Sequence, residues 1–503
     1  MRTFSRCRTP SVFRLSCVLL LCLGLRLPAT TGAQVLARPG WAGSGVTVET
    51  WWRRAVFYRL EPATFQDSDG DGRGDLGGVA QRVDYLQSLG VDAIILAPAA
   101  ASQPLSPNDD AGFDDLARAA STHHLRVLVT LSPAALGPAT NSGPDAGASL
   151  LSAARSWLTQ GAAGFFLDER LLAAPRLTPE LLHQLRALVA GFPGDRVLLS
   201  AAAPSGNPAL AAALRREVQL TASPPLGTST DPATLRGQVS SAGGLPLLAA
   251  VRSPVPDPAH DSTSLRGVLA VLLLASRSAV LLDYGQELGL DLAAGDAAPR
   301  MQWTPGNRTL PPPAPPQMPT DFSAPVYKPY VPYVPMLPRS ENPAPPPLPA
   351  AFVSEKPDPR TLPGFTTATL DPALTAPNGA TANVVTEDAQ PYSLLNLYRH
   401  LIQLHHQNPS LYDGAQLFLD HDAENVLVWL RRPTAGARTS TPVLAVCNLT
   451  DHNVHLDLDR ELSSLRLPRG GLHTLATGSP LPFENTQDIV LPAGGAFLGE
   501  FYR

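Results

Sequence analysis

Acidic side chains recur at alternate positions in the segment DSDGDGRGD, residues 67–75, with glycines between them. Carboxylates this close repel one another unless they share a cation, and the glycines let the loop curl around one. A hard cation with oxygen ligands, Ca²⁺ first, suits this pattern. The predicted ligands are the carboxylates of Asp67, Asp69, Asp71 and Asp75 and the backbone carbonyl of Arg73. An EF-hand is rejected because its twelfth loop position needs a glutamate and holds Gly78 here, which leaves a solvated acidic turn as the alternative.

Two predicted strands and a helix position this loop. Residues 55–60 form a short apolar run, and residues 91–96 form a β-branched run that Pro98 closes. Between them, residues 79–90 carry apolar side chains at helical spacing and end at Gly90, a helix stop. Strand, helix and strand over this length predict a βαβ unit with parallel strands.

The stretch FYRLEPATFQDSDGDGRGDLGGVAQRVDYLQSLGVDAIILAP, residues 57–98, resembles the opening of the alpha-amylase family, glycoside hydrolase family 13. The resemblance is closest to the α-glucosidase and oligo-1,6-glucosidase branch, which begins with a strand, a DS(N/D)GDGxGDLxGI calcium loop and LDYLxxLGVDAIWLSP. It implies a trimmed (β/α)₈ TIM barrel. Short alternating strands from residue 414 onwards then predict a C-terminal antiparallel β-sandwich.

The parts of the chain follow from this resemblance and from shifts in composition. Residues 304–363 are rich in proline and predict an extended surface insertion, which is a candidate docking segment for a protein partner. The predicted parts are a signal peptide (1–33), a lead-in (34–50), the barrel (51–303), the proline-rich insertion (304–363), a return to the barrel with its closing helix (364–413) and the β-sandwich (414–503).

The amino terminus resembles a secretory signal, with arginines before an apolar run at residues 15–25 and small residues at 31–33. The run is too short to span a bilayer comfortably, so the mature chain is expected to have no membrane span; an uncleaved anchor is the alternative. Three of the four cysteines lie in this leader, and only Cys447 lies outside it. A mature chain without an internal disulfide, exported to the periplasm or secreted, is therefore expected.

A net charge of −5 and the absence of a basic stripe argue against nucleic-acid binding. The family resemblance instead implies a sugar ligand, an α-glucan or an oligosaccharide.

The catalytic nucleophile of the family corresponds to Asp168, which follows the apolar run of residues 164–167. The carboxyl ends of barrel strands are where such enzymes place their chemistry. The family form is GFRxD, and its arginine is Phe166 here, so we expect Asp168 to have a raised pKa and to be a poorer nucleophile. Glu169 is not expected to substitute, because neighbouring strand residues face opposite sides.

Other catalytic elements of the family are missing. RVLLSAAAP aligns with the family's RVLVGE, so Ser200 and Ala201 stand where the general acid would be. Thr130, Pro133 and Ala134 replace the Asp-His motif of the third strand, and the sugar-gripping loops are cut short. The pair His260-Asp261 is either a displaced remnant of the seventh-strand motif or a solvated loop pair.

These losses lead to two hypotheses. The first is a catalytically inactive α-glucosidase-like scaffold or binding protein of carbohydrate metabolism. The alternative is an active retaining α-glucoside hydrolase or transglycosidase that uses Asp168 as its nucleophile. An enzyme needs a second carboxylate about 5–5.5 Å from the first across an open pocket. An inactive scaffold is expected to have an apolar or closed barrel mouth.

Overall fold

The computed structural model describes residues 48–98, 105, 112–137, 144–240, 247–251, 262–292, 298–307, 376–412, 414–419, 425–433, 441–467, 471–477, 486 and 488–501. The predicted signal peptide, most of the lead-in and proline-rich insertion, and the His260-Asp261 pair lie outside these residues. The domain boundaries stay predictions. Among the described residues, no helix is both long enough and apolar enough to cross a bilayer.

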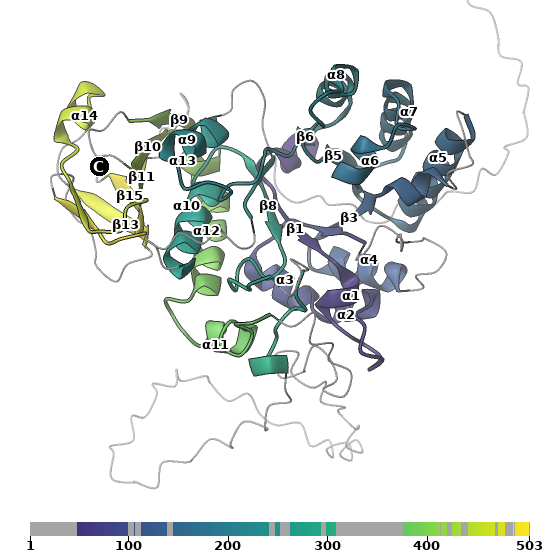
Figure 1. Ribbon diagram of the computed structural model, residues 1–503, viewed down its shortest axis with the longest axis horizontal. Coiled ribbons are helices and arrows are strands. Elements are labelled where there is room, and N and C mark those ends of the chain that lie inside the picture. Colours follow the sequence, from purple (N-terminus) through teal and green to yellow (C-terminus); the bar gives the residue numbers. More distant parts are fainter. Residues whose placement is uncertain are drawn as a thin grey trace, which may run out of the picture. The chain divides into compact units, whose positions relative to one another are not determined.

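Eight parallel strands form the first sheet, in the order β6-β5-β4-β3-β2-β1-β8-β7 (Figure 1). Parallel bridges from Ala222 to Leu247 and from Leu226 to Ala250 join its two edges, so the sheet closes into a barrel. The predicted TIM barrel is confirmed. Its strands are β1 (Val56–Leu60), β2 (Ala93–Leu96), β3 (Arg126–Leu131), β4 (Gly164–Leu167), β5 (Val197–Ser200), β6 (Leu220–Thr221), β7 (Leu247–Ala249) and β8 (Ala279–Asp283).

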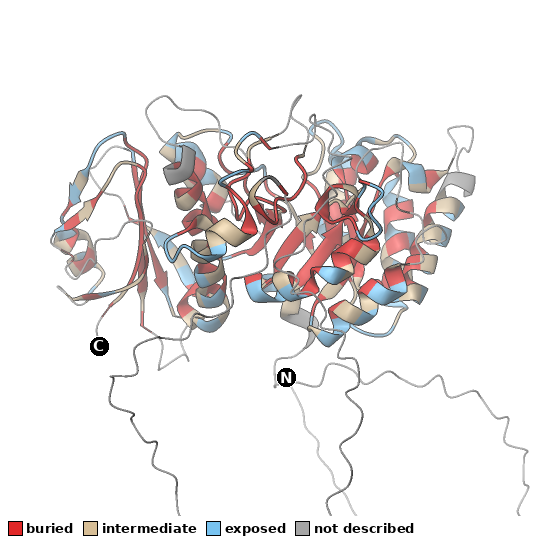
Figure 2. Ribbon diagram, turned by 90° about the horizontal axis from the view of Figure 1, so that it is seen from below, coloured by how far each residue is buried: buried red, intermediate tan, exposed pale blue. Residues whose placement is uncertain are grey.

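Helices surround the barrel, and their outer faces are exposed while the strands are buried (Figure 2). The α-helices are α1 (Pro62–Phe65), α2 (Leu76–Gln81), α3 (Val83–Leu89), α4 (Phe113–Thr122), α5 (Pro144–Gln160), α6 (Glu169–Ala173), α7 (Pro179–Ala190), α8 (Pro208–Glu217), α9 (Pro232–Ser240), α10 (Ser262–Leu274), α11 (Val384–Asp388), α12 (Leu394–Gln407), α13 (Pro409–Tyr412) and α14 (Asp459–Ser464). Short 3₁₀ helices are η1 (Val48–Arg54), η2 (Pro133–Leu136) and η4 (Pro305–Asn307).

The single helix predicted over residues 79–90 is wrong, because α2 and α3 are separate helices joined at Arg82. Arg82 leaves helical geometry (φ −106°, ψ 12°). Its Nε donates to Gln66 Oε1 at 2.7 Å, and its guanidinium lies 4.0 Å from the ring centroid of Trp303. These contacts accompany the break between the helices. The predicted stop at Gly90 is present, with a left-handed φ of 91° that favours glycine.

The C-terminal region contains two antiparallel sheets, which confirms the predicted β domain. The larger sheet has the order β13-β15-β11-β10-β9, and β12 pairs with β14 in the smaller one. A separate apolar core, which includes Val428, Leu456 and Phe497, contains residues from both sheets. The strands are β9 (Ala415–Phe418), β10 (Val426–Arg432), β11 (Val443–Asn448), β12 (Val454–Leu456), β13 (Leu472–Thr477), β14 (Ile489–Leu491) and β15 (Ala496–Phe501).

The barrel and the larger C-terminal sheet share one apolar core. Helix α10 contacts β11 and β15, and α12 contacts β13. Trp429 on β10 is fully buried, and its Nε1 donates to the carbonyl of Ala275, 3.4 Å away. Cys447 on β11 lies in the same core, and burial raises the pKa of its thiol. The sheet is therefore an integral support of the barrel's α10 side.

A buried carboxyl group ties the first and last barrel strands together. Glu287, in the turn after β8, is fully buried. Its Oε1 accepts hydrogen bonds from the hydroxyls of Tyr58 on β1 (2.7 Å) and Tyr85 on α3 (2.6 Å). Burial, followed by proximity to Glu287, raises the pKa of both tyrosines well above the ordinary value. Both hydroxyls therefore stay protonated as donors.

A close backbone contact at the start of β4 provides a test of barrel packing. Gly164 has φ 148°, and a Cβ there would lie 2.0 Å from the carbonyl oxygen of Val197 on β5. We expect Gly164→Ala to lower the free energy of unfolding by more than about 2 kcal/mol, measured by urea denaturation, because strain and overpacking add. Gly194→Ala is the control, since Gly194 has φ 90° but nothing within 4 Å of the added carbon. Equal losses in both variants would contradict the packing argument.

Candidate functional site

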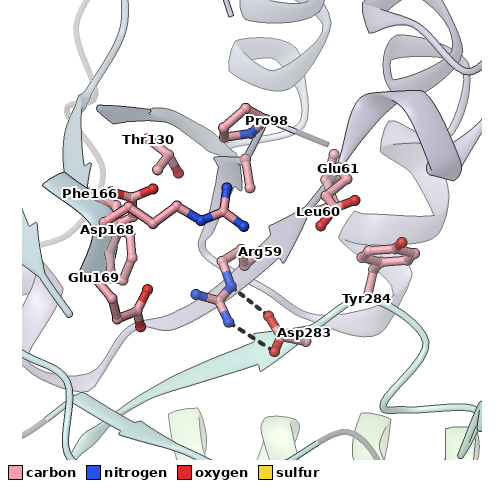
Figure 3. Close-up of a pocket in the computed structure, with 12 residues that line it drawn as sticks. Arg59, Leu60, Glu61, Pro98, Thr130, Phe166, Asp168, Glu169, Asp283 and Tyr284 are labelled. Atoms are coloured by element: carbon pink, nitrogen blue, oxygen red, sulfur yellow. Dashed lines mark hydrogen bonds and ion pairs between the residues drawn. The ribbon is translucent and has the colours of Figure 1, made fainter. Parts of the chain in front are cut away.

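A pocket of about 160 Å³ opens at the carboxyl ends of the barrel strands (Figure 3). This end of a barrel is where catalytic and binding residues collect. The volume is below the range of about 300–1,000 Å³ that is usual for sites of drug-sized ligands, so it suits a small one. The lining residues come from β1, β3, β4 and β8 and from the segments after β1, β2, β4 and β8: Arg59, Leu60, Glu61, Ala97, Pro98, Thr130, Phe166, Asp168, Glu169, Arg170, Asp283 and Tyr284.

Asp168 lies in this pocket, where the sequence predicted a nucleophile. It is 9% exposed and is the N-cap of α6, with its Oδ1 accepting a 2.7 Å hydrogen bond from the backbone N–H of Leu171. Burial raises the pKa of the Asp168 carboxyl, and the Leu171 N–H partly offsets that effect. The direction of this shift agrees with the expectation, but burial is its main cause and Arg59 and Arg170 act against it.

Glu169 lies in the same pocket, which corrects the expectation that it faces away. Strand β4 ends at Leu167, and Glu169 is the first residue of α6. The alternation of side chains along a strand therefore does not apply to residues 168 and 169. Two adjacent carboxylates thus face one pocket.

An ion pair that the sequence did not reveal crosses the pocket from β1 to β8. Arg59 Nε lies 2.6 Å from Asp283 Oδ1, and Arg59 Nη2 lies 3.0 Å from Asp283 Oδ2 (Figure 3). Asp283 raises the pKa of the Arg59 guanidinium, whose carbon lies 5.8 Å from the ring centroid of Phe166. Both residues lie at the carboxyl ends of barrel strands, where barrels collect their functional side chains, so that rule could have pointed to them.

The end of β5 contributes no carboxylate to the pocket. Ser200 and Ala201, which stand where the family resemblance predicts a general acid, are both fully buried. The Ser200 hydroxyl lies 3.2 Å from that of Thr221 on β6. Among the described residues, the carboxylates that line the pocket come from β8 and from the segments after β1 and β4. The mouth is nevertheless polar and open, which contradicts the apolar or closed mouth expected of an inactive scaffold.

The acidic loop brings together three of its four predicted carboxylates. Asp67, Asp69 and Asp71 each offer an oxygen, and these oxygens lie within 4.8 Å of one another. The Asp67 carboxylate accepts hydrogen bonds from the backbone N–H groups of Gly70 (2.6 Å) and Gly72 (2.9 Å), so the glycines wrap around it. The donor set is all oxygen and acidic, which fits a hard cation.

The other two predicted ligands are placed differently. Asp75 is the N-cap of α2 and accepts hydrogen bonds from the backbone N–H of Gly78 (2.7 Å) and the hydroxyl of Ser68 (2.7 Å). It is outside the group of converging carboxylates. Arg73 donates its backbone N–H to Asp71 Oδ1 at 2.7 Å, and the role of its carbonyl as a ligand stays a prediction.

Buried residues hold the acidic loop against the barrel. Arg300 Nη2 donates to the carbonyl of Gly72 at 2.9 Å, and Trp303 Nε1 donates to the carbonyl of Phe65 at 2.9 Å. Trp303 also packs edge-on against Tyr85, with 5.0 Å between the ring centroids. The MQW segment, residues 301–303, follows the last barrel strand in the sequence, and it anchors the acidic loop that follows the first.

Residues 59–117 match the alpha amylase catalytic domain. The oligo-1,6-glucosidase of Halalkalibacterium halodurans is 50% identical over 64 residues, which are 13% of this chain and 11% of that protein. The salivary alpha-glucosidase of Anopheles gambiae is 47% identical over 64 residues, 13% of this chain and 10% of that protein. The resemblance to the alpha-amylase family is confirmed. The chain thus spans about a tenth of the length of these curated relatives.

The alpha-amylase match contains the acidic loop and Arg59 but ends before Asp168. Solved structures extend the likeness in fold. An alpha-glucosyl transfer enzyme has a TM-score of 0.62 at 19% identity, with 90% of this chain and 99% of that chain covered. An isomaltulose synthase from Klebsiella has a TM-score of 0.59 at 15% identity over the same shares. At these identities the structures establish the fold alone.

The capping role of Asp168 gives a test that separates folding from chemistry. Asparagine accepts the same hydrogen bond from Leu171, so we expect Asp168→Asn to fold with nearly unchanged stability at neutral pH. Asp168→Ala loses the cap and should lose about 0.5–2 kcal/mol of unfolding free energy, measured by urea denaturation.

The pH dependence of stability gives a second readout on the same variants. Because folding raises the pKa of this carboxyl, its contribution to stability is present at low pH and declines as pH rises through the folded pKa. Asp168→Asn should remove that decline, since asparagine does not titrate. A stability loss in Asp168→Asn as large as in Asp168→Ala would contradict the capping role.

Proposed function

We propose that this chain is a catalytically inactive member of the alpha-amylase family that binds a carbohydrate at the barrel mouth. One observation carries the proposal: β5 ends in the buried Ser200 and Ala201, and no carboxylate reaches the pocket from that strand. A retaining glycosidase needs one carboxyl group to attack the sugar and another, about 5–5.5 Å away, to protonate the leaving oxygen. Serine and alanine cannot supply that proton.

The state of Asp168 supports the same proposal. Its Oδ1 accepts the capping hydrogen bond from Leu171, and burial favours its protonated form. A nucleophile must be ionised and must direct a lone pair at the sugar carbon. The cation closest to an activating role, Arg59, is engaged by Asp283.

An oligosaccharide or α-glucan is the proposed ligand. The curated relatives are named oligo-1,6-glucosidases and alpha-glucosidases, and one solved structure of similar fold is an inactive double mutant in complex with isomaltulose. The small, polar pocket suits a sugar ring. A protein partner docking on the proline-rich insertion, residues 304–363, is a further proposal that rests on composition alone.

The alternative is an active retaining hydrolase or transglycosidase with Asp168 as its nucleophile. The observation that favours it is the polar mouth, which holds Glu61, Glu169 and Asp283 in addition to Asp168. One of these carboxyl groups would have to protonate the leaving oxygen.

We further propose that the chain is exported, secreted or periplasmic, with residues 1–33 as its signal. Calcium is the proposed structural ion of the acidic loop, because three carboxylates converge there. The loop leads into two barrel helices, α2 and α3. Bound calcium would screen the mutual repulsion of the three carboxylates and hold the loop against Arg300 and Trp303.

Hydrolysis of p-nitrophenyl α-glucoside and of maltose tests the choice between the inactive and active hypotheses. We expect no turnover above background in the wild-type protein, because general-acid assistance alone contributes about 10²–10⁴ in rate. A purified oligo-1,6-glucosidase run alongside is the positive control. Binding of maltose, measured by calorimetry in the same preparation, should persist.

Asp168→Asn decides the meaning of any activity. Turnover in the wild type that disappears in this variant would establish the active alternative, since the variant retains the helix cap. Turnover that persists equally in both would point to a contaminant. Absence of both turnover and maltose binding would contradict the proposed function.

Calcium removal tests the acidic loop separately. Chelation with EDTA should lower the melting temperature of the wild-type protein, and added Ca²⁺ should restore it, because a ligand that binds only the folded state stabilises it. Asp69→Asn combined with Asp71→Asn should abolish this response. Asp114→Asn on α4 is the control, because it lies in the first turn of that helix, outside the converging group. An unchanged response in the double variant would exclude the loop as the binding site.

A further inference from the structure

The barrel mouth carries more acidic than basic side chains. Among the residues that the structure describes, its lining includes the carboxyl groups of Glu61, Asp168, Glu169 and Asp283 and two guanidinium groups, those of Arg59 and Arg170. Asp283 engages Arg59 through two hydrogen bonds of 2.6 and 3.0 Å, which neutralises that arginine locally. The described part of the lining therefore carries more carboxyl groups than guanidinium groups.

Glu169 is the clearest source of this excess. It is exposed at the pocket, and no hydrogen bond or ion pair within the described part of the chain engages its carboxylate. The charge of Glu169 contributes to the raised pKa of Arg59, but Arg59 is already paired with Asp283. The negative charge of Glu169 is therefore available to a ligand.

Thr130 supplies an independent indication of a ligand. It lines the pocket from β3, is 7% exposed, and its hydroxyl has no hydrogen-bond partner among the described residues. A buried hydroxyl without a partner is unfavourable for folding alone. Figure 3 places this hydroxyl on the pocket side of its strand, beside Phe166 and Asp168. A hydroxyl group on a bound molecule would satisfy it.

We propose that the mouth pocket selects a small protonated amine that also carries hydroxyl groups, such as an amino sugar, over a neutral sugar. The proposal rests on the proposed function, because it names the class of carbohydrate that the same site binds. The amine pairs with Glu169, and a ligand hydroxyl pairs with Thr130. The pocket volume of about 160 Å³ fits a ligand of monosaccharide size.

A bare metal ion suits this pocket less well than an organic cation. Among the residues that the structure describes, the carboxylates that converge within 4.8 Å of one another are those of Asp67, Asp69 and Asp71, and the mouth carboxylates form no such group. Carboxylates spread around a wider pocket match a cation whose charge and hydroxyls are separated by several bonds.

Calorimetry with three ligands of one ring tests the proposal: glucosamine, N-acetylglucosamine and glucose. The titrations are run at about pH 6, where an amine of this kind is protonated and ordinary glutamates are ionised. At low ionic strength we expect glucosamine to bind at least about fivefold more tightly than the two uncharged sugars, the size that a few partly exposed charge pairs produce. Added salt should reduce this preference.

Two variants, one that removes a negative charge and one that removes a positive charge, test whether the preference for glucosamine arises in this pocket. Glu169→Gln should reduce the glucosamine preference about two- to fivefold, and Arg170→Gln should increase it, since it removes a competing cation. Thr130→Val should weaken glucosamine and glucose alike while leaving the protein at least as stable as the wild type. Glu180→Gln, an exposed acidic position on α7 that pairs with Gln184, is the control and should change nothing.

The outcomes separate this inference from the proposed function. Equal binding of glucosamine and glucose, or a preference that Glu169→Gln leaves intact, overturns the amine selectivity and leaves a sugar site. Binding of maltose without any binding of glucosamine does the same. Failure of maltose, glucose and glucosamine to bind overturns both the inference and the proposed function.

Discussion

The buried carboxyl group of Glu287 is the constraint on which the barrel mouth depends. A polar group with no exposure is costly unless it is hydrogen-bonded, and the Oε1 of Glu287 accepts hydrogen bonds from Tyr58 on β1 and Tyr85 on α3. The register of β1 against β8 is therefore tied to this contact. Arg59 follows Tyr58 on β1, and its partner on β8 in that register is Asp283. The ion pair that crosses the pocket is a direct consequence.

The same region connects the pocket with the acidic loop. Tyr85 packs against Trp303, whose indole donates to the backbone just before the loop, and Arg82 packs against Trp303 while binding Gln66. The barrel and the acidic loop are thus joined by one buried network of side chains. Removing one of these side chains leaves a polar group of its partner without a hydrogen bond. Asp168 and Ser200, at the ends of β4 and β5, make other contacts, with Leu171 and Thr221 respectively.

Much of the fold could be predicted from the sequence because it is encoded locally. The apolar runs of β1 and β2, the stop at Gly90 and the alternating C-terminal strands are short-range patterns. Contacts between distant residues were harder to predict. The break at Arg82 arises beside Gln66 and Trp303, and the Arg59–Asp283 pair joins residues 224 positions apart. The prediction for Glu169 was wrong because β4 ends at Leu167, so the alternation of side chains along a strand does not extend to residues 168 and 169.

Asp168 has a structural role that does not depend on catalysis. Any side chain that accepts the Leu171 N–H keeps α6 in place, so selection for a folded protein alone retains a small set of residues there: aspartate, asparagine, serine and threonine. A substitution within that set changes the free energy of unfolding little, and a substitution outside it lowers that free energy because the cap is lost. The carboxylate at position 168 is therefore weak evidence of catalysis by itself, and the residues at the end of β5, Ser200 and Ala201, are more informative because neither caps a helix.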